Sequence, residues 1–319
     1  MSNIELKNIS DFDFTNIEES FSRSTKPILF VFSCGYEERS LSQFLILKGL
    51  EKNHNINYLC FSFSSYKSSA SRPSNDQILF DNEIEPIELE TKDWQGAWQN
   101  LSDYLSDTLN DEAQIYIDYS SMPRNWYCML AKKLVQGELG QSAVLIYSHG
   151  KYVDSKYPCV GYGDFNKFSG RPSITATSEV NIFGLGFDSV RTHGIWTYLD
   201  PQMSISVIAR APNNDEHIQR VSRENPEIIS SSSEQCEVDI DKFGKMLATL
   251  TDLSRKYQGF GDIALVPDGP KPMVIAMSLV PYYLDEKGFY SWHVGHVKPD
   301  GYKPIDIECS GEFFGFGVF

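Results

Sequence analysis

Short apolar runs alternate with segments that carry apolar residues at helical spacing over most of the chain. The first run, 27–32, ends in a Ser33-Cys34-Gly35 turn, and apolar residues at helical spacing follow over 41–50. This pattern predicts a buried strand, a tight turn and the start of a helix. Patterns of the same kind predict strands at 56–63, 84–89, 114–118 and 142–147 and helices at 94–109 and 125–136, with a Ser-rich loop at 64–74.

Strands that alternate with helices of this length are typical of an α/β fold with a mostly parallel sheet covered by helices on both faces. Pro86 lies inside the strand predicted at 84–89. Proline cannot donate to a strand ladder, so this strand is expected at an edge of the sheet.

The second half of the chain repeats short motifs of the first half in the same order. Gly35-Tyr36-Glu37 corresponds to Gly186-Phe187-Asp188, each after an apolar run and before a predicted helix. The other matches are Asn75-Asp76 with Asn214-Asp215, Ile87–Glu90 with Val238–Asp241, Pro123-Arg124 with Pro270-Lys271, and Tyr147-Ser148 with Tyr290-Ser291. An internal duplication explains this order, although two unrelated α/β domains would also share the strand–turn–helix pattern.

We therefore predict two tandem Rossmann-like halves related by internal duplication. A Gly/Ser/Thr-rich segment marks the join. The predicted boundaries are 1–168 for the first half, 169–178 for the linker and 179–319 for the second half.

Composition narrows the classes of protein. Hydrophobic residues make up 41% of the 319 residues, which is enough for a globular core. Forty-three acidic residues against 28 Lys and Arg give a net charge of −15, which disfavours non-specific nucleic-acid binding. No apolar run approaches the length of a membrane span, the N-terminus lacks a signal-peptide pattern, and the six cysteines are scattered. We expect reduced thiols and a cytoplasmic protein without a membrane partner.

The repeated motifs lie at strand ends, where parallel sheets bind ligands. Proline after Ser120-Ser121 suits the first position of a helix, whose N-terminus favours an anion. Cations gather in the same loops: Arg39, Arg72, Arg124, Arg191, Arg210 and Lys271. These cations either bind a phosphate-bearing ligand between the halves or pair internally with carboxylates such as Glu37, Glu38 and Asp188. The predicted ligand-binding residues are Ser33, Gly35, Glu37, Arg39, Arg72, Asn75, Asp76, Ser120, Ser121, Arg124, Gly186, Asp188, Arg191, Asn214, Asp215, Asp268, Gly269 and Lys271.

Several alternatives stay open at single positions. Asn75-Asp76 and Asn214-Asp215 also fit helix caps. A Cys34 nucleophile with His149 or His193 as base competes with a half-buried thiol of no chemical role. The chain has no phosphate-loop, dinucleotide or nucleophile-elbow motif, and its histidines do not group, so we predict no cofactor and no metal site.

Phe32-Ser33-Cys34-Gly35 and Tyr116–Arg124 resemble motifs of the CARF sensor domains of bacterial immune systems and of their fused two-copy relatives, the SAVED domains. The second segment is similar to the family's strand–Asp-x-Ser/Thr–Gly turn before a helix, although Met122-Pro123 replaces the usual glycine. The resemblance implies a nucleotide-type signal bound between the two halves and a protein partner through which the chain acts.

Three classes of function remain. The first is a nucleotide or phosphorylated-ligand sensor in a bacterial defence or conflict system. The second is an enzyme on such a substrate, with Glu37, Glu38, Asp76 or Asp118 as acid/base and arginine anion clamps. The third is a structural or antitoxin-like subunit. A homodimer is compatible with each of them.

Overall fold

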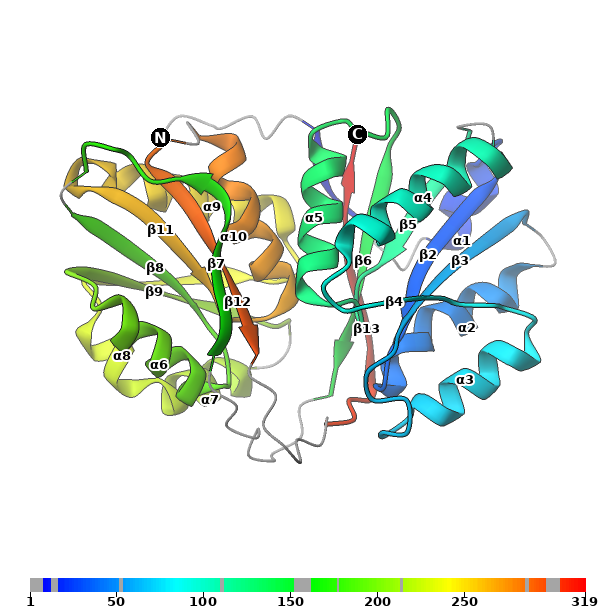
Figure 1. Cartoon of the computed structure of the whole chain (residues 1–319), viewed down its shortest axis with the longest axis horizontal. Helices are drawn as coiled ribbons and strands as arrows, with labels where there is room; N and C mark the ends of the chain where they lie inside the picture. The colour runs from blue at the N-terminus through cyan, green and yellow to red at the C-terminus, as the bar shows by residue number, and fades with distance from the viewer. Residues whose placement is uncertain are drawn as a thin grey trace. The chain divides into compact units, whose positions relative to one another are not determined.

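The computed structural model describes residues 8–12, 17–51, 54–109, 112–151, 162–176, 178–212, 215–284, 287–296 and 305–319. The chain divides into two compact units (Figure 1). We call the unit formed by 8–155 and 303–319 the first unit, and the unit that contains 156–302 the second unit. Each is built on one sheet with helices on both faces, as the sequence predicts.

The sheet of the first unit has the strand order β1-β13-β6-β5-β2-β3-β4. Strands β2 to β6 are parallel, whereas β13 runs antiparallel to both β6 and β1. The order reverses between β2 and β5, which makes this pair the topological switch point. The strands are β1 (Ile9–Phe12), β2 (Ile28–Cys34), β3 (Ile56–Phe63), β4 (Ile87–Leu89), β5 (Gln114–Asp118), β6 (Ala143–Gly150) and β13 (Cys309–Val318).

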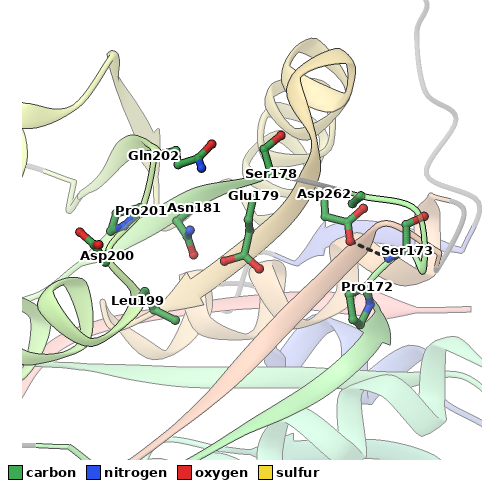
Figure 2. Close-up of a pocket in the computed structure, with 11 residues that line it drawn as sticks. Pro172, Ser173, Ser178, Glu179, Asn181, Leu199, Asp200, Pro201, Gln202 and Asp262 are labelled. Carbon is green, nitrogen blue, oxygen red and sulfur yellow. Dashed lines mark hydrogen bonds between the residues drawn. The ribbon is translucent and has the colours of Figure 1, made fainter.

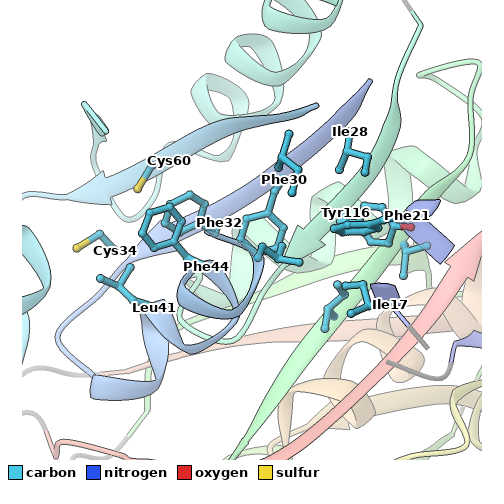
Figure 3. Packing of buried hydrophobic residues seen from close by; sticks show 14 of the residues in the cluster. Ile17, Phe21, Ile28, Phe30, Phe32, Cys34, Leu41, Phe44, Cys60 and Tyr116 are labelled. Atoms are coloured by element: carbon cyan, nitrogen blue, oxygen red, sulfur yellow. The ribbon is translucent and has the colours of Figure 1, made fainter. Parts of the chain in front are cut away.

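Aromatic side chains dominate the core on one face of this sheet. Phe32 stacks on Phe30 and on Phe44, with ring centroids 5.3 and 5.0 Å apart (Figure 3). Because alternate residues of β2 face the same side, Phe30, Phe32 and Cys34 all enter this core. The helices of the unit are α1 (Ile17–Arg23), α2 (Ser42–Leu50), α3 (Arg72–Asp81), α4 (Trp94–Leu109) and α5 (Arg124–Val135), with a 3₁₀ turn, η2 (Glu38–Leu41), before α2.

The sheet of the second unit has the order β10-β9-β8-β11-β12-β7, with β7 antiparallel to β12 and the others parallel. Its strands are β7 (Tyr162–Arg171), β8 (Glu179–Leu185), β9 (Met203–Arg210), β10 (Glu234–Asp239), β11 (Asp262–Pro267) and β12 (Phe289–His296). Its helices are α6 (Ser189–Leu199), α7 (Asp215–Glu224), α8 (Pro226–Ser231), α9 (Phe243–Tyr257) and α10 (Lys271–Tyr283), with a 3₁₀ turn, η4 (Gln258–Phe260).

The two sheets share one strand order when β2 to β6 are matched with β8 to β12, as an internal duplication requires. In each sheet, an antiparallel strand lies beside the last parallel strand, and it comes from the other half of the sequence. β7 follows β6 in the chain but pairs with β12, and β13 follows β12 but pairs with β6. The unit boundaries therefore differ from the predicted ones: 162–171 belongs to the second sheet and 309–318 to the first.

Most predicted elements coincide with the observed ones. β4 lies at a sheet edge as predicted, but it spans only 87–89, so Pro86 precedes the strand and does not lie inside it. One difference lies at 64–74, predicted as a loop, because α3 already begins at Arg72. Tyr147-Ser148 and Tyr290-Ser291 also differ in position, since the first pair lies late in β6 and the second near the start of β12.

Two further findings concern the described residues. None of their helices is long and apolar enough to cross a membrane. The five cysteines among them form no disulfide.

Candidate functional site

The switch point of the first unit brings the turn after β2 against the turn after β5. A Cβ atom placed on Gly35 would lie 3.1 Å from the Cβ of Ser121 and 3.4 Å from its Oγ. Glycine at this position therefore lets the two turns approach closely. The predicted residues Ser33, Gly35, Ser120 and Ser121 do meet at this edge.

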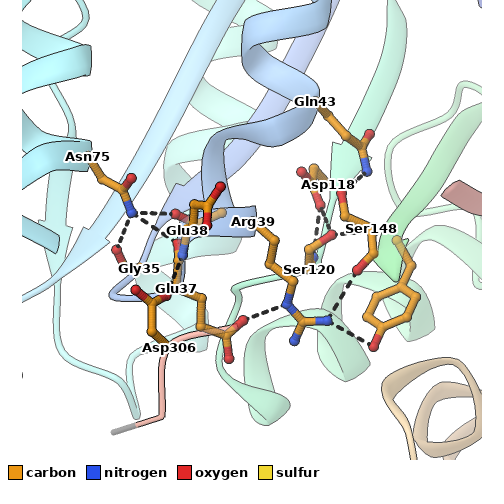
Figure 4. Close-up of polar contacts among 12 residues, drawn as sticks. Gly35, Glu37, Glu38, Arg39, Gln43, Asn75, Asp118, Ser120, Ser148 and Asp306 are labelled. Atoms are coloured by element: carbon orange, nitrogen blue, oxygen red, sulfur yellow. Dashed lines mark hydrogen bonds and ion pairs between the residues drawn. The ribbon is translucent and has the colours of Figure 1, made fainter. Parts of the chain in front are cut away.

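Arg39 is buried in this edge and bonded to the protein itself (Figure 4). Its Nε donates to Glu37 Oε2 at 2.7 Å, and its Nη1 donates to Tyr147 Oη and to the Ser148 carbonyl, both at 3.1 Å. Burial alone would lower the pKa of Arg39, but Glu37 and Tyr147 raise it above its ordinary value. For Arg39 the structure shows the internal ion pair that the sequence left as an alternative to an anion clamp.

Arg72, the first residue of α3, is held in the same way. Its Nε lies 2.7 Å from Asp76 Oδ1, and its Nη1 donates to the carbonyl of Phe63 at the end of β3, at 3.0 Å. Cys34 Sγ also lies 3.4 Å from this Asp76 oxygen. Burial raises the pKa of the Cys34 thiol to about 12, so the thiol stays protonated at neutral pH. This finding favours the alternative of a thiol without a chemical role.

Asn75 holds the first turn in place from within α3. Its Nδ2 donates to the carbonyls of Gly35 and Glu37 and to Ser40 Oγ, at 2.9 to 3.1 Å. The helix begins at Arg72, so Asn75 lies in the first helical turn. The prediction of a helix cap is therefore wrong for Asn75, which instead fixes the loop that follows β2.

The segment before β13 packs over this edge from the far end of the chain. Asp306 accepts hydrogen bonds from the Glu38 amide at 2.8 Å and from Ser71 Oγ. The Arg39 amide donates to the Ile307 carbonyl at 3.1 Å. No local pattern predicts this contact, because it joins residues more than 230 positions apart.

Two hydroxyl groups at this edge are enclosed without a hydrogen-bond partner among the described residues, namely Ser33 Oγ and Ser121 Oγ. Ser120 differs, since its hydroxyl donates to Asp118 Oδ1 and accepts from the Ser148 amide at 2.7 Å. Arg124 opens α5 directly after this turn. It also hydrogen-bonds Tyr127, whose pKa burial raises and Arg124 partly lowers.

The same edge of the second unit is filled by a carboxylate. A Cβ atom on Gly186 would lie 2.4 Å from the carbonyl oxygen of Asp268. The Asp268 side chain lies 2.5 Å from Arg191 Nη2 and accepts from Thr192 Oγ1 at 2.5 Å. Asp188 caps α6, accepting from the Arg191 amide at 3.2 Å. Arg191 is thus paired internally, like Arg39.

Two residues of this edge escaped the sequence argument. Asn225, between α7 and α8, donates its Nδ2 to the Gly186 carbonyl at 2.9 Å and so does for Gly186 what Asn75 does for Gly35. His217 Nδ1 donates to the Ala209 carbonyl at 2.7 Å, as Arg72 does to that of Phe63. Burial lowers the pKa of His217 to about 4. Sequence reasoning could have found Asn225 and His217 only by aligning the buried polar residues near equivalent strand ends of the two halves.

The remaining predicted residues fall into three groups. Gly269 packs closely, because a Cβ atom there would meet the Leu185 carbonyl at 2.8 Å. Lys271 opens α10 as Arg124 opens α5, whereas Arg210 lies exposed beside Glu237 and Asp239 of β10. Asn214 and the side chain of Asp215 lie outside the described residues.

Comparisons with known proteins add no family. Neither the models of protein families nor the curated proteins match this chain. Among solved structures, a crystal structure of O-ureido-L-serine synthase is similar over 87% of this chain and 75% of that chain, with 10% sequence identity and a TM-score of 0.20. A TM-score this low carries no argument about this protein.

Proposed function

We propose that this protein is a sensor of a phosphate-bearing, nucleotide-type ligand, bound at the switch point of the first unit. The observation that carries the proposal is the pair of enclosed hydroxyls, Ser33 Oγ and Ser121 Oγ, without hydrogen-bond partners among the described residues. A buried polar group without a partner costs about 1–3 kcal/mol, so a ligand oxygen that accepts from it is favoured. The N-terminus of α5 beside them favours an anion.

The second unit supports an asymmetric ligand. Its equivalent edge holds the Asp268 carboxylate, which already pairs with Arg191 and would repel a phosphate. The ligand would then bind its phosphate in the first unit alone, an outcome that the sequence allowed beside a symmetric ligand.

The internal bonding of the carboxylates favours binding over catalysis. Glu37 pairs with Arg39, Asp76 with Arg72, and Asp118 with Ser120. These are three of the four residues considered as acid/base groups. The resemblance to CARF and SAVED domains supports a role in a bacterial defence or conflict system, exerted through a protein partner.

The experiment is a thermal-unfolding titration with ATP, ADP and pyrophosphate. We expect the wild-type midpoint to rise by several degrees at ligand concentrations about 100-fold above Kd. The double variant Ser33→Ala/Ser121→Ala removes only hydroxyls without partners, so it should fold with wild-type or slightly higher stability and lose the rise.

Arg124→Ala and Lys271→Ala form a matched pair, because each residue opens the corresponding helix of its unit. Arg124→Ala should weaken the response and Lys271→Ala should retain it. A wild type that responds to none of the three compounds, or an equal response in the Ser33/Ser121 variant, would overturn the proposal.

A further inference from the structure

A cavity of about 350 Å³ lies at the amino-terminal ends of the strands of the second unit, the opposite end of the sheet from Gly186. It is formed where β8 begins at Glu179, where β11 begins at Asp262, and where α6 ends at Leu199 (Figure 2). The residues predicted as ligand-binding do not line it, and the function proposed above does not depend on it.

The cavity is acidic. Three carboxylates, those of Glu179, Asp200 and Asp262, line it, and its lining residues include no Lys, Arg or His. The last residue of α6, Leu199, also lines it, and the carbonyl end of a helix attracts positive charge. A phosphate or carboxylate ligand would be repelled here, whereas a cation would be attracted.

Asn181 is the residue of the cavity whose side chain indicates a ligand. Its side chain is only 1% exposed, its Nδ2 donates to the Glu179 carboxylate, and its Oδ1 has no hydrogen-bond partner among the described residues. It follows Glu179 by two positions on β8, so both side chains face the same side of the strand (Figure 2). Burial raises the pKa of the Glu179 carboxyl, and the nearby Asn181 amide only partly offsets this.

We propose that this cavity binds an aliphatic polyamine of about the size of spermidine. Its ammonium groups would pair with Glu179 and with the other carboxylates, and one N–H would donate to the Asn181 amide oxygen. Among the described residues, no three Asp, Glu, His or Cys side chains converge closely enough to hold a metal ion. Carboxylates spread around a cavity suit an elongated cation with several N–H donors better than a point charge.

Isothermal titration calorimetry of the full-length protein with spermidine tests this site. The protein carries a net charge of −15, so the buffer should contain about 150 mM salt to screen attraction to the surface. Glu179→Gln keeps the shape of the side chain and removes its charge, and we expect it to weaken binding at least tenfold. Asn181→Ala should weaken binding several-fold.

Asp252→Asn is the matched control, because it removes one negative charge from the exposed face of α9, away from the cavity. It should bind spermidine within twofold of the wild type. If Asn181→Ala does not fold, Glu179→Gln decides alone. No measurable binding by the wild type would overturn the proposal. Equal affinities of Glu179→Gln and Asp252→Asn would also overturn it, because the measured heat would then come from attraction to surface charge.

Discussion

Gly35 and Gly186 occupy equivalent turns but leave different amounts of room. A Cβ atom on Gly186 would approach a backbone oxygen of Asp268 to 2.4 Å, whereas one on Gly35 would meet the Ser121 Cβ at 3.1 Å. We expect Gly186→Ala to lower the free energy of unfolding by about 2–3 kcal/mol, because backbone must shift. Gly35→Ala should cost less, because the nearest atom that its Cβ would meet belongs to the Ser121 side chain and not to the backbone. Urea unfolding of both variants gives the comparison, and equal losses would contradict the packing described here.

His217 should make stability depend on pH. Its pKa is lowered to about 4 by burial, while the unfolded chain titrates near the ordinary value of about 6.5. The contribution is fully present above pH 6.5 and is lost as the pH falls toward 4, since only the unfolded chain takes up the proton. Between pH 7.5 and 5.5 this residue should cost the wild type about 1.4 kcal/mol.

The measurement is urea unfolding of His217→Asn against the wild type at the two pH values. The asparagine amide can still donate to the Ala209 carbonyl but does not titrate, so the variant should lose this part of the pH dependence. His193→Gln, a substitution of a histidine exposed on α6, is the control and should retain it. A variant with the wild-type pH dependence would show that His217 takes up a proton while folded.

The arginines show how far residue-level prediction reaches. The sequence predicted Arg39, Arg72 and Arg191 in the loops that follow strands, and the structure has them in the first turns of the helical segments after those loops, η2, α3 and α6. The strand–turn–helix pattern is local, so the error is small. It could not choose between anion clamp and internal ion pair, because the local carboxylates Glu37 and Asp76 are compatible with either role. The other partners, Tyr147 and Asp268, come from distant strands and turns. Asn225 was missed for the same reason, since its role depends on reaching the Gly186 carbonyl and not on a motif shared with Asn75.

At the scale of elements, periodicity succeeded where a segment has one buried face or is buried throughout. The helix predicted at 94–109 and the strands predicted at 56–63 and 114–118 have the observed bounds. Helix α3 was not among the predicted helices, although Asn75-Asp76 was considered as a helix cap, because its first residues belong to a Ser- and Pro-containing stretch that resembles a loop. Proline at the second position of a helix is compatible with helix initiation, since the first turn lacks intrahelical acceptors for its amides.

At the scale of the whole molecule, the exchange of β7 and β13 could not be predicted. The hydrophobic pattern of a strand indicates which of its side chains face a core. It does not indicate which of two equivalent sheet edges the strand joins. The chain passes to the second unit between residues 151 and 162 and returns between 296 and 305. Each sheet is thus completed by a strand that follows, in the sequence, the last parallel strand of the other unit. β7 follows β6 and completes the second sheet, and β13 follows β12 and completes the first.

This exchange predicts that the last 15 residues stabilise the first unit alone. Removing 305–319 takes the partner strand from both β6 and β1 and removes the buried Phe316 and Val318, worth about 1.5–3 kcal/mol each. Hydrogen exchange should accelerate in β1, β6 and η2, while β8 to β12 keep their protection. A peptide of residues 305–319 added in trans should restore the protection of β6.

Deletion of Phe319 alone is the control, because this residue is 63% exposed and lies outside β13. It should leave the exchange of both units close to that of the wild type. Faster exchange spread equally over β6 and β8 in the longer truncation would mean that the two units unfold as one cooperative body. In that case β13 would support the whole chain, and the strand exchange would couple the stabilities of the two units instead of completing each sheet separately.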